Sequence, residues 1–268
     1  MVSTPPELSI DGAPATLDDL THVALVNYGA YTSFRVEQGG VRGLDLHLAR
    51  LEAEAVELFG APVGDSHLRG LMRSAVAGRD ACWLRVSLFA PEISPRTPEW
   101  QGTPRVMIAV SPTPAPLADA PRLQLQTYAR EAAHLKHAAT FGLIRARRMA
   151  RLAGFDDALF VDGEGLISEG SLWNVGFVRD DQVIWPQAPM LAGVAQALVQ
   201  RGLADAGLTG RMEPLRVADL ERFDAAFLCN SATPACAIAA IGGRSFSILP
   251  GLIERLQGAW ASNPVQPI

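Results

Sequence analysis

The most distinctive chemical feature of this chain is a single lysine. Of its 23 lysine and arginine residues, only Lys136 is a lysine. Both residue types supply surface charge, but only a lysine amine can lose its proton near neutral pH and condense with an aldehyde or ketone. Lys136 is therefore either a nucleophile or an ordinary surface lysine, and its potential partners must decide between these interpretations.

Two further segments hold residues of matching chemistry. Glu169 lies in ISEGSLWN, at the end of an expected strand. It is either an exposed turn residue or a buried acid that needs a partner. Gly193 precedes an expected helix, whose first residues, Val194 and Ala195, would direct free N–H groups and the positive end of the helix dipole at a phosphate. Many helices begin this way, so this signal alone is weak.

Hydroxyl and guanidinium groups complete the set. Ser231 and Thr233 follow the strand AAFLCN, and they either bind phosphate or form a turn. Arg50 lies on an expected helix, where it either binds phosphate in a cleft or extends along the surface. An amine, an acid, an arginine and two phosphate-type turns are the groups needed to hold pyridoxal phosphate.

The first half of the chain is predicted to position part of this set in an α+β domain. Alternating β-branched and aromatic residues predict paired strands over 21–40, and apolar residues at helical spacing predict a helix over 44–60. A second helix is expected at 65–77, and strands are expected at 81–90 and 103–111. We expect an open antiparallel sheet.

The proline-rich segment Ser111–Pro121 predicts a linker or an ordered crossover. After it we expect a strand at 122–129, a helix ending at Gly154, and short strands over 157–186 with turns at 162–163 and 180–181. A helix at 194–207 and a strand at 225–231 follow. This half is typical of a barrel-like β structure with helices outside, so the predicted domains are 1–115 and 116–268.

Composition excludes several functional classes. Hydrophobic residues make up 49% and charged residues 19%, with a net charge of −5, and the arginines are scattered, so no nucleic-acid partner is expected. There is no apolar run of about 18 residues, so no membrane span is expected. The N-terminus lacks the pattern of a signal peptide. The chain has an odd number of cysteines, Cys82, Cys229 and Cys236. This predicts buried thiols in a reducing compartment, so we expect a cytoplasmic protein. No metal site is predicted.

With these residues in view, the chain resembles the class IV (fold type IV) pyridoxal-phosphate enzymes. These include branched-chain and D-amino-acid aminotransferases and 4-amino-4-deoxychorismate lyase. The motifs LDLHLARL, HLKHAATF, GFDDALFVDGEGLISEGSLWNVGFV, MLAGVAQAL and LCNSATPACAI follow the family order between about Val26 and Ile241. The resemblance implies a small N-terminal open α/β sandwich, a larger C-terminal pseudo-barrel domain, pyridoxal 5'-phosphate as cofactor, and a homodimer.

The resemblance also assigns roles to positions of this sequence. Lys136 becomes the Schiff-base lysine, Glu169 the contact of the pyridine nitrogen, and Arg50 a phosphate ligand. The other cofactor positions that it implies are Asn174, Val194, Ala195, Asn230, Ser231 and Ala232.

Four positions depart from the family pattern. Ala192 replaces the usual proline, Ala195 a threonine, and Phe141 a tyrosine, while Thr32 takes the place of a glutamate. These departures concern the exact activity and leave the cofactor unchanged.

The implied substrates are amino acids and 2-keto acids, and the freed lysine would act as general base and acid at the α carbon. ISEGSLWN favours an aminotransferase, whereas YTS, LCNSATP and the pair Lys136-His137 resemble the lyase, which releases pyruvate and 4-aminobenzoate. A cofactor-binding protein without turnover is a third possibility. His134 and His137 are expected to be structural. The substrate-pocket candidates are Tyr31, Thr32, Arg85 (alternatively a structural ion-pair residue) and Ala232.

Overall fold

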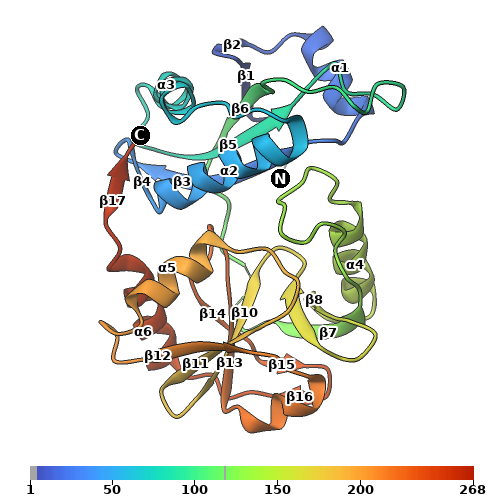
Figure 1. The fold of residues 1–268 in the computed structure, drawn as a ribbon. Helices are drawn as coiled ribbons and strands as arrows, with labels where there is room; N and C mark the ends of the chain where they lie inside the picture. The colour runs from blue at the N-terminus through green and yellow to red at the C-terminus, as the bar shows by residue number, and fades with distance from the viewer. Residues whose placement is uncertain (1–4, 118) are drawn as a thin grey trace. The chain divides into compact units, whose positions relative to one another are not determined.

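The computed structural model describes residues 5–117 and 119–268, and it divides the chain into two compact units (Figure 1). Unit 1 is Met1–Pro114 with Leu135–Ala139 and Val265–Ile268, and unit 2 is Ala115–His134 with Thr140–Pro264. The division expected from the sequence, at residue 115, placed the two short segments of unit 1 in the second domain. The segment that contains Lys136 therefore belongs to unit 1.

Unit 1 is built on one seven-stranded sheet with the strand order β17-β4-β3-β5-β6-β1-β2, in which all neighbours are antiparallel. This confirms the open antiparallel sheet expected for the first half. Its elements are β1 (Glu7–Ile10), β2 (Ala13–Pro14), α1 (Leu17–Leu25), β3 (Ala30–Glu37), β4 (Gly40–Arg42), α2 (Leu44–Phe59), α3 (Asp65–Val76), β5 (Ala81–Phe89), β6 (Arg105–Ser111) and β17 (Val265–Pro267).

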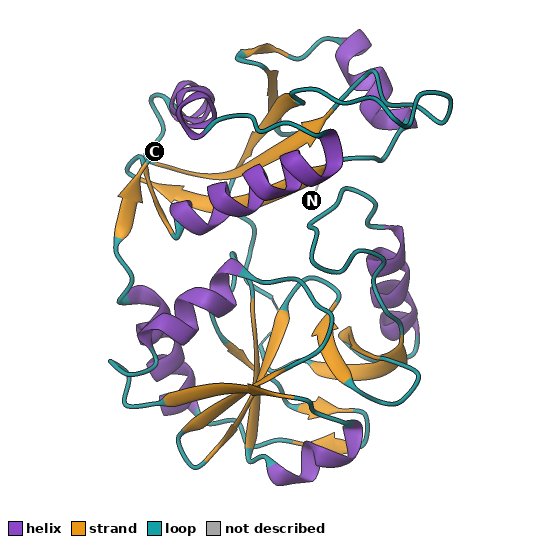
Figure 2. Cartoon of the chain, in the orientation of Figure 1, coloured by secondary structure: helices purple, strands orange, loops and turns teal. Residues whose placement is uncertain are grey.

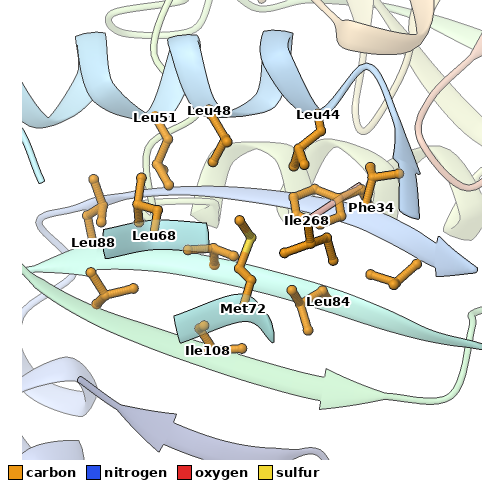
Figure 3. Packing of buried hydrophobic residues seen from close by; sticks show 14 of the residues in the cluster. Phe34, Leu44, Leu48, Leu51, Leu68, Met72, Leu84, Leu88, Ile108 and Ile268 are labelled. Carbon is orange, nitrogen blue, oxygen red and sulfur yellow. The ribbon is translucent and has the colours of Figure 1, made fainter. Parts of the chain in front are cut away.

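The core of unit 1 lies between its sheet and the helices α2 and α3. Leu44, Leu48 and Leu51 recur at helical spacing on α2, and Figure 3 shows their side chains pointing toward the strands. Helix α2 ends at Gly60, whose φ of 80° is a left-handed conformation that favours glycine. The predicted helix of this region is confirmed, and one face of it is fixed against the sheet.

Unit 2 contains two five-stranded sheets, drawn in orange among the purple helices in Figure 2. Their strand orders are β12-β11-β10-β13-β14 and β16-β15-β7-β8-β9, so the described strands form no closed barrel. The elements are β7 (Arg122–Thr127), α4 (Phe141–Leu152), β8 (Asp157–Val161), β9 (Ile167–Gly170), β10 (Asn174–Arg179), β11 (Gln182–Pro186), α5 (Val194–Gly202), β12 (Thr209–Glu213), the 3-10 helix η1 (Val217–Arg222), β13 (Ala225–Cys229), β14 (Cys236–Ala237), β15 (Ala240–Ile241), β16 (Arg244–Ser245) and α6 (Pro250–Ala261).

Two local expectations had different outcomes. The predicted turn at Asp180 and Asp181 is confirmed, because both residues have positive φ (50° and 57°) and join the antiparallel strands β10 and β11. The strand expected to start at Thr21 is wrong. Residues 21–25 complete α1, whose N-cap Thr16 forms a capping box with Asp19 and so starts a helix before the β-branched run. The proline-rich linker joins β6 to β7, with residue 118 outside the described residues.

The three cysteines are buried and form no disulfide with one another. Burial raises the pKa of the Cys229 thiol to about 12, which keeps it protonated and unreactive. Across residues 5–117 and 119–268, the helices are all too short or too polar to cross a membrane.

Candidate active site

Lys136 lies in a segment attached to the edge of β3 in unit 1. The N–H of Tyr31 donates to the carbonyl of Lys136 at 3.0 Å, and the N–H of Ala138 donates to the carbonyl of Gly29 at 2.7 Å. Ala30 and His137 form an isolated antiparallel bridge between these two bonds. The lysine is half-buried, and this strand-like pairing fixes the direction of its main chain.

A second group holds the same segment from the helix side. The main-chain N–H of Lys136 donates to Oε1 of Glu54 at 2.6 Å, and Glu54 is only 2% exposed. Sequence reasoning missed Glu54. The helical spacing contained a signal, because Glu54 follows Leu51 by three residues and Leu44 by ten, which places it on the apolar face of α2.

Tyr31 brings two cations together in unit 1. The guanidinium carbon of Arg85 lies 3.6 Å from the centroid of the Tyr31 ring, and Nζ of Lys136 lies 4.9 Å from it. Nε of Arg85 also donates to Oγ of Ser87 at 3.2 Å, and burial lowers the pKa of Arg85. Of the alternatives for Arg85, the structure shows stacking on an aromatic ring, a geometry that leaves the guanidinium edge available to a carboxylate.

His47, on the buried face of α2, and Arg50 both contact the hydroxyl of Thr32 on β3. The Thr32 hydroxyl lies 2.6 Å from Nδ1 of His47 and accepts a hydrogen bond from Nη2 of Arg50 at 2.9 Å. Thr32 is fully buried. Burial, then the charges of Arg50 and Lys136, hold the pKa of His47 well below its usual value of 6.5. His47 is therefore neutral, and its Nδ1 forms a hydrogen bond with the Thr32 hydroxyl.

In unit 2, Glu169 is a buried acid with partners. Its Oε1 accepts from Nη1 of Arg130 at 3.1 Å and from the N–H of Leu191 at 3.2 Å. The side chains of Arg130 and Glu169 are 5% and 7% exposed, so the ion pair is shielded from water. Sequence reasoning missed Arg130, which has no special pattern among the many arginines of the chain.

Asn174 holds the loop before α5. Its Nδ2 donates to the carbonyl of Leu191 at 2.9 Å, so Glu169 and Asn174 bind the main chain of Leu191 on its two sides. A Cβ at Gly193 would collide with Oδ1 of Asn174. No described side chain caps α5. The main-chain N–H groups of its first turn, at Val194 and Ala195, point out of the end of the helix.

The turn after β13 is closed by its own side chain. Oδ1 of Asn230 accepts from the N–H groups of Ala232 and Thr233, at 3.0 and 2.8 Å. Nδ2 of Asn230 donates to the carbonyl of Leu172 at 3.2 Å. Asn230 therefore shapes the turn that contains the half-buried Ser231.

The predicted residues thus fall into two groups, each held together within its own unit. Unit 1 contains Tyr31, Thr32, Arg50, Arg85 and Lys136, and unit 2 contains Glu169, Asn174, Val194, Ala195, Asn230, Ser231 and Ala232. Phe141, which replaces a family tyrosine, is the first residue of α4 and is 77% exposed.

Comparisons with known proteins agree with this arrangement of elements. The family model described as amino-transferase class IV matches residues 29–241. A probable branched-chain-amino-acid aminotransferase from Rickettsia felis is 32% identical over 99 residues, which are 36% of this chain and 34% of that protein. The matched part is thus about a third of this relative's length.

Two solved structures share the fold along nearly the whole chain. A hypothetical aminotransferase from Mycobacterium tuberculosis, in a PLP-bound form, has a TM-score of 0.77 and 23% identity, and the match covers 96% of this chain and 99% of that one. The branched-chain aminotransferase of Thermoproteus uzoniensis with norvaline has a TM-score of 0.82 and 21% identity, covering 96% and 94%. At these identities the likeness shows the fold.

Proposed function

Because the chain belongs to the class IV aminotransferase family, we propose that it transfers an amino group from an amino acid to a 2-keto acid. Membership confirms the family predicted from the sequence and its cofactor, pyridoxal 5'-phosphate. The observation that supports the proposed activity best is the setting of Lys136. It is the only lysine of the chain, and both its main-chain N–H and its carbonyl are hydrogen-bonded within unit 1.

The residues present fit this cofactor. Lys136 supplies an amine for its aldehyde, Arg50 a guanidinium for its phosphate, and Glu169 a buried carboxylate for its pyridine nitrogen. The uncapped first turn of α5 adds phosphate-binding N–H groups, and Gly193 keeps the approach to that turn free of a side chain. We propose that these groups hold the cofactor, together with Asn174 and Ser231.

Pyridoxal phosphate, when bound, supplies an aldehyde for the substrate amine and a ring that takes up negative charge from the α carbon. The work of the protein is to position groups and move protons. Lys136 would remove the α proton of the amino acid and return a proton during transfer. Glu169, paired with Arg130, would favour a protonated pyridine nitrogen.

The substrate would be held in unit 1 beside this lysine. We propose that Arg85, stacked on Tyr31, binds a carboxylate of the amino acid or keto acid. Thr32 is proposed to act through Arg50 rather than on the substrate, because its hydroxyl is fully buried and bonded to His47 and Arg50. Ala232 stays a proposed substrate neighbour.

A half-reaction screen tests the proposed activity. Purified protein loaded with pyridoxal phosphate is mixed with single D- or L-amino acids, including branched-chain ones. The absorption spectrum of the cofactor and the keto acid released are then followed. We expect conversion of the cofactor to its pyridoxamine form and release of a 2-keto acid. K136A and K136R, which keeps the charge but cannot condense, should both be inactive.

The outcomes separate the alternatives. Release of pyruvate and 4-aminobenzoate from aminodeoxychorismate, without amino transfer to any keto acid, would contradict the aminotransferase and favour the lyase. A protein that keeps the cofactor yet never forms the pyridoxamine form with any amino acid would be a binder without turnover.

We also propose that the chain forms a homodimer, and α4 supports an interface. Ile144 and Leu152 on this helix are 62% and 67% exposed, and they line a surface hollow together with Arg147, Arg148 and Arg151. Exposed apolar side chains grouped on one helix are typical of interaction surfaces.

Oligomeric state tests this interface. The wild type should sediment as a dimer, and I144E should shift it toward monomer. M212E places the same charge at a residue of β12 that is 51% exposed, and it should leave the dimer intact. A monomeric wild type would contradict the proposal.

A further inference from the structure

Glu54 is a carboxylate in an unusual place for a helix residue. It is 2% exposed and lies on the face of α2 that packs in the core of unit 1, on the same side as Leu48 and Leu51. Burying an ionised carboxylate is costly unless strong hydrogen bonds or opposite charges compensate. A purely structural helix would place an apolar residue here, so the buried carboxylate requires a specific explanation.

The contact of Glu54 supplies one. Its Oε1 accepts the main-chain N–H of Lys136 at 2.6 Å, a short bond of the kind that a charged acceptor forms. The bond links two positions 82 residues apart in sequence. On the other side, Tyr31 donates its N–H to the carbonyl of the same lysine at 3.0 Å. The peptide groups on both sides of the Lys136 α carbon are thus fixed, one by a helix and one by a strand.

The charges around Glu54 also help to explain a carboxylate at this buried position. Arg50 precedes it by one helical turn, and the charges of Arg50 and Lys136 both act on His47, which lies on the same face of α2. Two cations and a neutral histidine therefore share this part of unit 1, and a carboxylate among them offsets positive charge.

We propose that Glu54 is a positioning residue for Lys136: its carboxylate fixes the lysine main chain and so sets the place from which the amine works. The inference rests on the proposed function of Lys136. Glu54 acts through the lysine backbone and touches neither substrate nor cofactor in this role.

Two conservative variants separate the effect of the length of the Glu54 side chain from the effect of its charge. E54D keeps the charge but is one methylene too short to hold the same N–H, whereas E54Q keeps the reach and an acceptor oxygen but loses the charge. The matched control is E52D. Glu52 lies on the same helix and also accepts main-chain N–H groups, those of Val63 and Gly64, at 3.0 and 2.7 Å.

The first measurement is amide hydrogen exchange of Lys136 in the protein without cofactor, which is independent of catalysis. Losing a hydrogen bond to a charged acceptor should speed exchange of this amide about ten- to hundredfold in E54D. E54Q replaces the charged acceptor by a neutral one of about half the strength, so it should speed exchange about three- to tenfold, less than E54D does, and E52D should speed exchange only at Val63 and Gly64.

The second measurement is the half-reaction at saturating amino acid and cofactor. E54D should lower kcat about tenfold or more with little change in KM, because a misplaced amine affects proton transfer and leaves substrate binding intact. E54Q should restore most of kcat, and E52D should keep it. A merely structural Glu54 would lower stability without this split.

The inference is overturned if E54D leaves both Lys136 exchange and kcat as in the wild type, or if E54Q is as impaired as E54D. Failure of the proposed function itself is recognised separately. In that case the wild type would take up no cofactor at Lys136, while the exchange data would still show whether Glu54 holds the segment.

Discussion

The Thr32 hydroxyl lies 2.6 Å from Nδ1 of His47 and at the same time accepts a hydrogen bond from Arg50 at 2.9 Å. The hydroxyl therefore bonds two partners at once, and the arginine is the donor in its bond. Arg50, Thr32 and His47 form one hydrogen-bonded network, in which burial keeps the histidine neutral. It joins β3 to α2 and orients the arginine that we propose binds the cofactor phosphate.

Removing the hydroxyl should break both bonds at once. T32V has nearly the same shape and leaves the Nδ1 atom of buried His47 without its hydrogen-bond partner, so we expect the free energy of unfolding to fall by about 1–3 kcal/mol. T32S keeps the hydroxyl and should lose much less. Urea denaturation of the protein without cofactor measures the stability of both variants. A T32V protein as stable as the wild type would show that these hydrogen bonds do not stabilise the fold.

The neutral His47 predicts a pH dependence of stability. Its pKa in the folded protein is well below 6.5, chiefly because of burial and then because of the charges of Arg50 and Lys136. Below pH 6.5 the unfolded chain binds a proton at this residue and the folded chain does not. The free energy of unfolding should therefore fall with decreasing pH by up to about 1.4 kcal/mol per unit from this group, and above that pH the effect should vanish.

H47N isolates this contribution, because an asparagine amide can form a hydrogen bond with Thr32 but does not titrate. Unfolding free energies of both proteins at pH 7.5, 6.5 and 5.5 give the comparison. The advantage of the wild type over H47N should shrink below pH 6.5. A difference that is constant across this range would mean that His47 binds its proton equally well in the folded and unfolded states, and would contradict the lowered pKa.

Gly193 gives a steric prediction. In G193A the new methyl would collide with Oδ1 of Asn174, which must then release Leu191 or move the start of α5. We expect a loss of about 1–3 kcal/mol of stability and weaker binding of pyridoxal phosphate. G258A is the control, because it lies inside α6 with open space around its Cβ position and should be neutral or stabilising. Equal cofactor affinity of G193A and the wild type would contradict the proposed role of this turn.

The sequence predicted the parts of the site that differ from their background. Lys136 stood out because every other basic residue is arginine, and Glu169 because it is an acid in an apolar stretch, while their roles at the cofactor come from the family resemblance and stay predictions. The helix over 44–60 was predicted from spacing that tertiary packing reinforces. The strand expected at Thr21 was wrong because the capping box at Thr16 outweighs the β propensity of five residues.

The partners were harder to predict. Arg130 is one of many arginines, and only the fold brings it to Glu169, 39 residues later. Glu54 and His47 share the apolar face of α2 with Leu51, so the helical spacing placed them inward, but their contacts lie on β3 and on the lysine segment. Contacts between residues far apart in sequence depend on topology, which local patterns do not specify.

Covalent fixation of the cofactor tests the central claim most directly. The protein loaded with pyridoxal phosphate is reduced with borohydride, digested, and analysed by mass spectrometry, with K136R treated in parallel. We predict one phosphopyridoxyl group, on the peptide that contains Lys136, and none in K136R. A wild type that retains no reduced cofactor, or retains it anywhere other than Lys136, would contradict the account.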